Sequence, residues 1–99
     1  RPTAIICGSD VLALGVMAAA ADLGIDVPRQ LSVVGFDNLA LAGYWRPSLT
    51  TLSQPIGLIG REAVRLAAQL VAGNPAPPTR WLTPELVVRG STAPPASTT

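Results

Sequence analysis

The stretch LSVVGFD, residues 31–37, determines how the rest of this sequence is interpreted, because an apolar strand runs straight into an acid. Its apolar residues are nearly continuous, which is typical of a parallel strand that is covered on both faces. Asp37 then stands where this strand ends. Open parallel sheets bind ligands in the crevice beyond the carboxyl ends of their strands. The stretch therefore predicts a parallel sheet with an acid at its ligand-binding edge.

A strand and a helix are predicted before this stretch. Residues 4–7 form a short apolar, partly β-branched run that indicates a buried strand. Ser9 is a suitable N-cap for a helix that continues to about Leu23, and Gly24 provides its stop. Strand, helix and strand over roughly 30 residues make a βαβ unit with a right-handed crossover. The residues therefore predict an α/β fold.

The predicted first helix has no polar face. Residues 11–21 are uncharged, and apolar side chains lie all around the helix. A helix of this kind is buried on more than one side. Because a two-layer domain covers one side only, we expect the other side to meet a partner subunit or a second domain. Deep burial inside a larger parent domain is the alternative.

The second half of the sequence alternates turns with short regular elements. We expect a loop over 38–48, an extended piece over 50–52, a helix from Pro55 that Gly73 ends, and short strands over 80–83 and 85–89. This second helix is amphipathic, with one polar face. Residues 90–99 are rich in Ser, Thr, Ala and Pro, which favours a flexible tail. The predicted organisation is a structured region over 1–89 followed by a tail over 90–99.

Composition narrows the class of protein. The chain has 99 residues, 48% of them hydrophobic, which fits one globular domain. Its net charge of +1 gives no electrostatic footprint for nucleic acid or an anionic membrane, so we expect any DNA contact to come from outside this sequence. No apolar run approaches the ~20 residues of a membrane-spanning helix. The sequence starts at Arg1 without an initiator methionine, and we expect it to be part of a longer chain.

Catalytic and metal-binding chemistry find little support in the sequence. It contains no histidine, and it has neither a GxxxxGK[ST] phosphate loop nor a Gly-x-Ser-x-Gly nucleophile motif. Cys7 is the single cysteine, so it forms no internal disulfide and no metal site, and no cofactor is expected. Its apolar neighbours predict a buried small hydrophobe, with a reactive thiol as the alternative. We expect a binding protein and not an enzyme.

Three polar residues form the candidate ligand site. Asp37 ends the second strand, Ser9 follows the first, and Gln54 precedes the second helix. An ionised carboxylate accepts up to four hydrogen bonds and donates none, which suits a sugar, nucleoside or polyol rich in donors. Two of these residues have an alternative role, Asp37 in capping the turn at 38–40 and Ser9 in capping the first helix.

With these features in place, the sequence resembles a known family. Five segments match, in order and spacing, the C-terminal part of bacterial LacI/GalR-type transcriptional regulators: A-I-x-x-x-x-D-x-x-A-L-G at 4–15, D-V-P-x-x-L-S-V-V-G-F-D at 26–37, P-x-L-T-T-L-x-Q-P at 47–55, G-R-E-A-V at 60–64 and L-V-V-R-G-S-T at 86–92. The resemblance implies a three-layer, parallel-sheet subdomain of the periplasmic-binding-protein-like type I fold, present only as a fragment.

The resemblance also implies roles for individual residues. Effector contacts of the family fall on Ser9, Asp37 and Gln54, although the family often has the longer asparagine at the position of Ser9. Its dimer surface falls on the first helix and the loop after the acid, at Leu12, Leu14, Met17, Tyr44 and Trp45. Residues 85–89 are implied to cross back to an N-terminal subdomain, most of which this sequence lacks.

The resulting hypothesis is the effector-sensing and dimerising portion of a cytoplasmic transcriptional regulator. We expect a small polar, sugar-like effector and a homodimer, with operator DNA bound only through an N-terminal headpiece outside this sequence, and no membrane partner. A sugar-binding protein of a transport system, which has the same fold, is the alternative. An α/β enzyme is disfavoured because acid–base residues are missing.

Overall fold

The computed structural model describes residues 1–96, which divide into two compact units. Unit 1 combines Arg1–Ser53 with the segment that begins at Glu85. Unit 2 is Gln54–Pro84. The chain therefore leaves unit 1 once and returns to it. The last residues of the predicted tail, 97–99, lie outside the described part of the chain.

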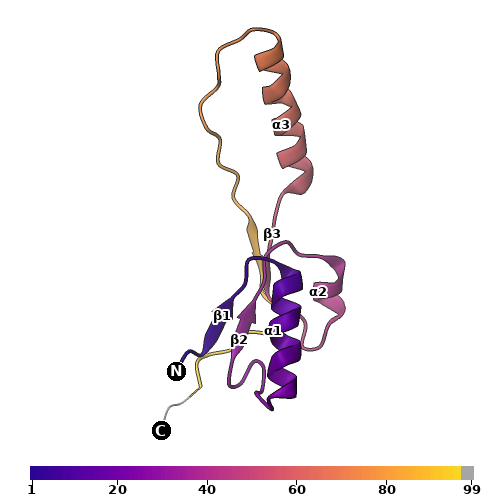
Figure 1. The fold of residues 1–99 in the computed structure, drawn as a ribbon, viewed down its shortest axis with the longest axis vertical. Coiled ribbons are helices and arrows are strands. Elements are labelled where there is room, and N and C mark those ends of the chain that lie inside the picture. The colour runs from indigo at the N-terminus through magenta and orange to yellow at the C-terminus, as the bar shows by residue number, and fades with distance from the viewer. Residues whose placement is uncertain (97–99) are drawn as a thin grey trace. The chain divides into compact units, whose positions relative to one another are not determined.

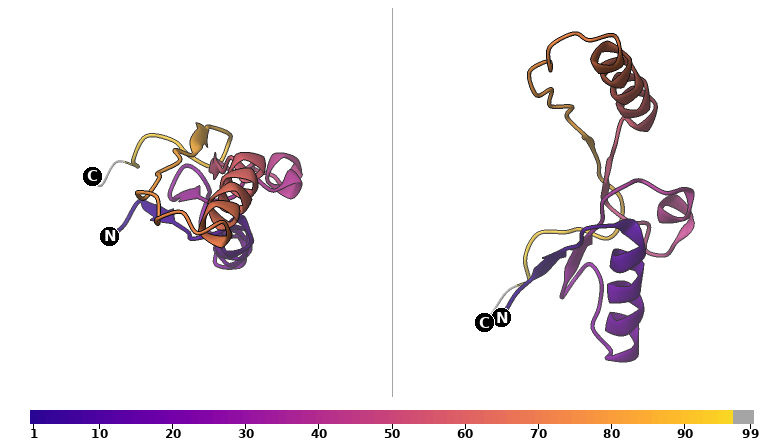
Figure 2. Two further views of the ribbon diagram at one scale, coloured as in Figure 1. Left: turned by 90° about the horizontal axis from the view of Figure 1, so that it is seen from above. Right: turned by 45° about the horizontal axis from the view of Figure 1, so that its top comes forward.

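Unit 1 begins with a βαβ motif (Figure 1). Strands β1 (Ala4–Ile6) and β2 (Ser32–Val34) pair in parallel, and helix α1 (Asp10–Asp22) connects them. Helix α1 lies alongside this pair, and Figure 2 shows the same arrangement from a second direction. The predicted α/β class and its first strand–helix–strand unit are confirmed.

Local sequence signals set both ends of α1. The Ser9 hydroxyl accepts a hydrogen bond from the amide of Leu12 at 3.1 Å, which is the N-cap interaction that the sequence predicts. At the other end, Gly24 has a φ of 70°, a left-handed conformation that glycine adopts without steric cost. The predicted and observed helices therefore agree closely.

The remaining strands make the sheet mixed, which corrects the predicted three-layer parallel sheet. Strands β3 (Thr51–Ser53) and β4 (Glu85–Val87) form an antiparallel pair. Parallel bridges from Val34 to Thr50 and from Asp37 to Ser53 join this pair to β2. Strands β3 and β4 lie on either side of unit 2 in the sequence, so the chain leaves unit 1 along β3 and returns along β4 in the opposite direction. The described residues thus contain small mixed sheets.

Two further helices complete the structure. Helix α2 (Ala40–Tyr44) occupies part of the segment that was predicted to be a loop. Helix α3 (Ile56–Val71) begins directly after Pro55, as predicted from the place of proline in first turns, and it is the regular element of unit 2. The strand predicted over 80–83 does not form, because no neighbouring strand pairs with it in the described part of unit 2.

The hydrophobic core of unit 1 lies between α1 and β2. It consists of small and medium-sized side chains: Cys7, Ala13, Met17, Leu31, Val33, Ala42 and Leu49. Burial raises the pKa of the Cys7 thiol above its ordinary value, because the thiolate loses hydration there. Cys7 is therefore a buried small hydrophobe, which the sequence favoured over a reactive thiol.

Residues 90–93 depart from the predicted tail. Ser91 is fully buried, its hydroxyl donates to the carbonyl of Val33 at 2.6 Å, and the amide of Val33 donates back to the carbonyl of Ser91 at 2.9 Å. Ser32 and Ala93 also exchange hydrogen bonds of 3.1 Å. Composition alone suggested flexibility, but residues 91 and 93 provide hydrogen-bond partners for residues 32 and 33 of β2. The start of the predicted tail is therefore part of unit 1.

The outer side of α1 is apolar and exposed. Met17 and Ala13 face the core, whereas Val11 and Leu12 on the opposite side are exposed. Leu41 and Tyr44 of α2 are large apolar side chains that are exposed as well. Among the described helices, none is both long and apolar enough to cross a membrane.

Candidate functional site

The carboxyl ends of β1 and β2 meet at one edge of unit 1. Just beyond β1, the amide of Cys7 donates to the carbonyl of Val34 at 2.8 Å. Further along, the amide of Asp10 donates to the carbonyl of Phe36 at 3.0 Å. The segments that carry Ser9 and Asp37 therefore run side by side at this edge, as expected for neighbouring parallel strands.

Asp37 occupies an unusual turn. Asp37 has a φ of 137° and Asn38 a φ of 64°, so two consecutive residues with side chains lie in the region that favours glycine. Such conformations cost on the order of 1–3 kcal/mol each and persist only where the surroundings impose them. One of those constraints is the amide of Asp37, which donates to the carbonyl of Leu52 at 2.9 Å.

A buried carboxylate, that of Asp10, is hydrogen-bonded to the end of this turn. Asp10 has no exposed surface, and its Oδ2 accepts a hydrogen bond from the amide of Leu39 at 2.7 Å. Its Oδ1 accepts from the hydroxyl of Thr51 at 2.6 Å. An acid in the first turn of a helix is electrostatically favourable, and this is all that the local sequence indicates for Asp10. The local sequence does not indicate these contacts, because Leu39 and Thr51 lie 29 and 41 positions away.

Asn38 links the turn to β3 and to the segment after β4. Its Oδ1 accepts a hydrogen bond from Nη2 of Arg89 at 2.7 Å, and its Nδ2 donates to the hydroxyl of Ser53 at 3.4 Å. Arg89 also donates from Nη1 to the carbonyl of Leu49 at 3.0 Å. Sequence reasoning missed this arginine, although it is the one charged residue in the motif LVVRGST.

The three residues predicted to bind a ligand have different positions. Ser9 and Asp37 are both partly buried at the edge described above, and the Ser9 hydroxyl also caps α1. Gln54 is partly buried as well and follows Ser53, the residue that pairs with Asp37, but it is the first residue of unit 2. The amide of Leu39, in the turn over 38–40 that Asp37 could alternatively cap, donates a hydrogen bond to Asp10.

The residues predicted to form a dimer surface divide into two groups. Leu12 is 62% exposed and Tyr44 is 80% exposed, so both present their side chains to the outside of unit 1. Leu14 and Trp45 are partly buried and pack against the core. Met17 is only 5% exposed, which corrects its assignment to a surface. It lies one helical turn after Ala13 and therefore shares the inward side of α1.

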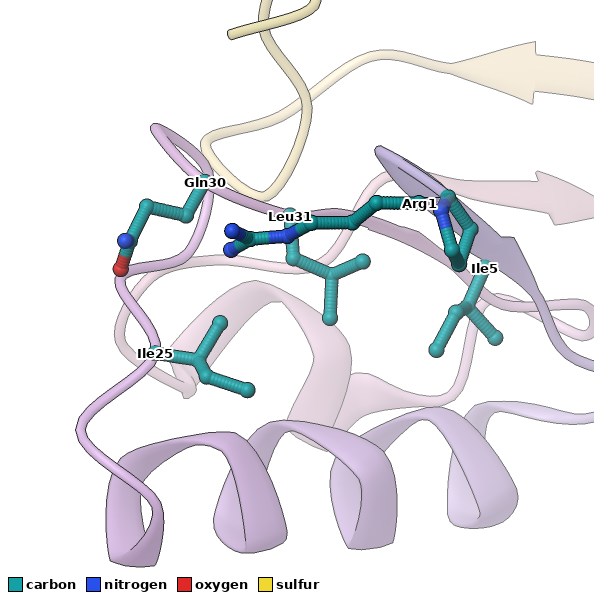
Figure 3. A pocket seen from close by; sticks show the side chains of 6 residues that line it. Arg1, Ile5, Ile25, Gln30 and Leu31 are labelled. Carbon is teal, nitrogen blue, oxygen red and sulfur yellow. The ribbon is translucent and has the colours of Figure 1, made fainter. Parts of the chain in front are cut away.

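A cavity of about 220 Å³ lies elsewhere in unit 1 (Figure 3). The aliphatic side chains of Ile5, Ile25 and Leu31 face it, together with Arg1, Pro2 and Gln30. Leu31 precedes β2, whereas Asp37 follows it, so this cavity belongs to the opposite end of the strand. Its lining is mostly apolar, with Arg1 and Gln30 as the polar members. Among the described residues, no cluster of acids, cysteine or histidine is suited to hold a metal ion.

Known proteins resemble this chain over most of its length. The family described as "periplasmic binding protein-like domain" matches residues 1–92. The HTH-type transcriptional regulator MalR of Streptomyces coelicolor is 49% identical over 92 residues. These residues are 92% of this chain but 27% of MalR, so the chain spans about a quarter of the length of this curated relative.

Two solved structures match in both fold and sequence. The complex of the transcriptional regulator CelR with cellobiose matches 90% of this chain and 28% of its own, with 32% identity and a TM-score of 0.80. The lac repressor dimer bound to operator and the anti-inducer ONPF matches 92% of this chain and 28% of its own, with 35% identity and a TM-score of 0.83. All three relatives are transcriptional regulators and not enzymes.

Proposed function

This chain belongs to the family of periplasmic binding protein-like domains, in the form that LacI-type transcriptional regulators carry, and from that premise we propose that it senses a small polar effector for such a regulator. The observation that carries the proposal is the turn at Asp37. A carboxylate stands at the carboxyl edge of parallel strands, in a strained conformation that several neighbours impose.

The chemistry of this edge favours a ligand rich in hydroxyl groups. The Asp37 carboxylate accepts hydrogen bonds, while the Ser9 hydroxyl can both donate and accept. We propose Gln54 as a third contact, because it follows directly on the strand residue that pairs with Asp37. The cellobiose complex of CelR supports a sugar as the class of effector.

The connections of the turn suggest how binding would be transmitted. Asp37 pairs with Ser53, the last residue before unit 2, and Asn38 bonds to Arg89, which follows the strand that returns from unit 2. An effector bound at Asp37 therefore acts next to both connections. The effector can shift the protein between two conformations only by as much as its affinities for the two conformations differ. DNA would be bound in the cytoplasm by a headpiece outside this sequence.

We also propose that the chain forms a homodimer through the outer side of α1. Val11 and Leu12 of α1 and Tyr44 of α2 are apolar side chains that are exposed, and residues 11–21 carry no charge. The lac repressor relative is a dimer in its operator complex. An apolar helix face of this kind is costly to leave in water, which favours its burial in an interface.

An Asp37→Ala substitution tests the proposed site. In the polypeptide that the complete gene encodes, we expect the Kd for a bound sugar, with cellobiose as the first probe, to rise at least about tenfold, because a charged hydrogen-bond acceptor is lost. Operator affinity without the sugar should change by less than about twofold, since Asp37 makes no DNA contact in this proposal.

The matched control is Asp22→Ala, which removes an exposed acid at the end of α1. Isothermal titration calorimetry and operator titration measure the two affinities. An Asp37→Ala protein that binds and responds to the sugar as the wild type does would remove Asp37 from the site.

A further inference from the structure

We infer that Asp10 is a positioning residue that holds Asp37 in its ligand-binding orientation; this inference rests on the proposed function. The carboxylate of Asp10 has no exposed surface, so it cannot touch an effector itself. It can act only through the residues to which it is bonded, and these surround Asp37.

Asp10 fixes the turn from both sides. Its backbone amide donates to the carbonyl of Phe36 at 3.0 Å, and its Oδ2 accepts from the amide of Leu39 at 2.7 Å. Only Asp37 and Asn38 lie between these two anchor points, and both have a positive φ. One residue therefore closes a two-residue turn on each side and imposes a conformation that the turn would not adopt by itself.

A third contact extends this support to the neighbouring strand. Oδ1 of Asp10 accepts a hydrogen bond from the hydroxyl of Thr51 at 2.6 Å, and Thr51 is the first residue of β3. The next residue of β3, Leu52, accepts a hydrogen bond from the amide of Asp37 at 2.9 Å. Asp10 thus sets the position of the strand that holds Asp37 as well as the ends of the turn.

The surroundings of Asp10 are shaped to a carboxylate. A Cβ atom built on Gly35 would meet Oδ1 of Asp10 at a distance that real structures do not show. Burying a charge is costly unless it is well hydrogen-bonded, and a packed apolar residue at such a place often gives equal or greater stability. The two hydrogen bonds that the carboxylate accepts, from residues 39 and 51, therefore indicate a role in geometry more than in stability.

Asp10→Asn in the complete polypeptide tests this inference. Asparagine is as large as aspartate, but its NH2 group cannot accept a hydrogen bond, so either the Leu39 amide or the Thr51 hydroxyl loses its acceptor. We expect hydrogen exchange at the amides of Leu39 and Asp37 to accelerate about tenfold or more. Exchange at the amide of Val33, which is bonded to Ser91, should stay unchanged. Unchanged exchange at Leu39 and Asp37 would overturn the inference.

Binding of cellobiose supplies a readout that general destabilisation would not reproduce. Asp10→Asn should raise the Kd about tenfold when Asp37 is present, but by less than about twofold in an Asp37→Asn background, where there is no carboxylate to orient. Equal losses in both backgrounds would contradict positioning. If the wild type does not bind cellobiose, the sugar form of the proposed function fails, while amide exchange still decides the role of Asp10.

Thr51→Val provides a second variant if Asp10→Asn does not fold. It removes the hydroxyl that bonds to Oδ1 and leaves the Leu39 contact in place. We expect faster exchange at the amide of Asp37 and recovery in Thr51→Ser, which restores the hydroxyl. Unchanged exchange at the Asp37 amide in Thr51→Val would count against Asp10 as its support.

Discussion

Gly35 occupies a place in β2's extension where no side chain fits. A Cβ atom there would lie 2.9 Å from Cδ2 of Leu49 and closer still to Oδ1 of Asp10. We predict that Gly35→Ala lowers the free energy of unfolding by about 1–3 kcal/mol, because the buried side chains of Asp10 and Leu49 have to move to relieve the overlap. Urea denaturation followed by circular dichroism measures this change.

Gly15→Ala is the matched control at the same scale. A Cβ atom on Gly15 meets no atom within 4 Å, and Gly15 lies inside α1. Replacing glycine by alanine within a helix raises stability by roughly 0.5–1 kcal/mol. Equal effects of the two substitutions would show that the contact with Asp10 and Leu49 does not restrict Gly35.

At the residue scale, sequence reasoning succeeds where the deciding contacts are local. The cap at Ser9 bonds to Leu12, three positions away, and the predicted cap is confirmed. Asp10 depends on partners 29 and 41 positions away, and its role was missed. Met17 was assigned to a surface because the family resemblance places a dimer surface on α1. Every side of α1 looks alike in the sequence, so composition could not tell which side faces β2.

At the scale of the element, an ion-pair cluster supports α3. Glu62 lies 2.8 Å from Nη2 of Arg65 in the same helix and 2.7 Å from Nη1 of Arg80 in the following segment. The hydrogen bond from Arg65 is the main cause that lowers the pKa of Glu62, with Arg80 adding to it. The helix is thereby joined to the segment that follows it within unit 2.

The lowered pKa of Glu62 predicts a pH dependence for unit 2. Because the folded pKa is below the ordinary value of 4.5, the cluster contributes its full stabilisation above that pH and loses it as pH falls through the folded pKa. An NMR titration of the Glu62 carboxylate should show this low midpoint, and added salt should raise it towards the ordinary value. An Arg65→Gln variant that titrates like the wild type would contradict the assignment.

Elements with strong local signals were predicted, but the pairing of strands that lie far apart in the sequence was not. Helix α1 follows from its cap at Ser9, α3 follows from Pro55 and its pattern of apolar residues, and both end at a glycine that the sequence indicates. The antiparallel pairing of β3 with β4 does not follow from local signals, because unit 2 separates them in the sequence. Residues 90–93 were expected to be a flexible tail for the same reason, because their partners on β2 lie about 60 positions earlier and no local pattern indicates them.

At the scale of the whole molecule, the exposed side of α1 predicts self-association. Leu12→Asp should raise the dimer dissociation constant at least about tenfold, because it places a charge in an apolar interface. Sedimentation velocity at several concentrations measures this change. Val64→Asp, on the exposed surface of α3, is the control and should leave the association intact. A wild-type chain that remains a monomer at every concentration would refute the interface.

At this scale the family could be predicted from the sequence, but the extent of the sheet within this chain could not. The motifs around Asp37 and Gln54 are specific in sequence and spacing, so the resemblance to LacI-type regulators is confirmed by the comparisons. A three-layer sheet requires strands from several parts of a chain. The described residues supply four strands of three residues each, and they form two small pairs.

The contact between Val33 and Ser91 has a consequence for biosynthesis. Val33 lies in the middle of β2, yet its amide and carbonyl are bonded to a residue 58 positions later in the chain. Buried backbone groups need partners, so β2 cannot reach its final state while it emerges from the ribosome. A nascent chain that has not yet reached Ser91 would leave these backbone groups of Val33 without their partners.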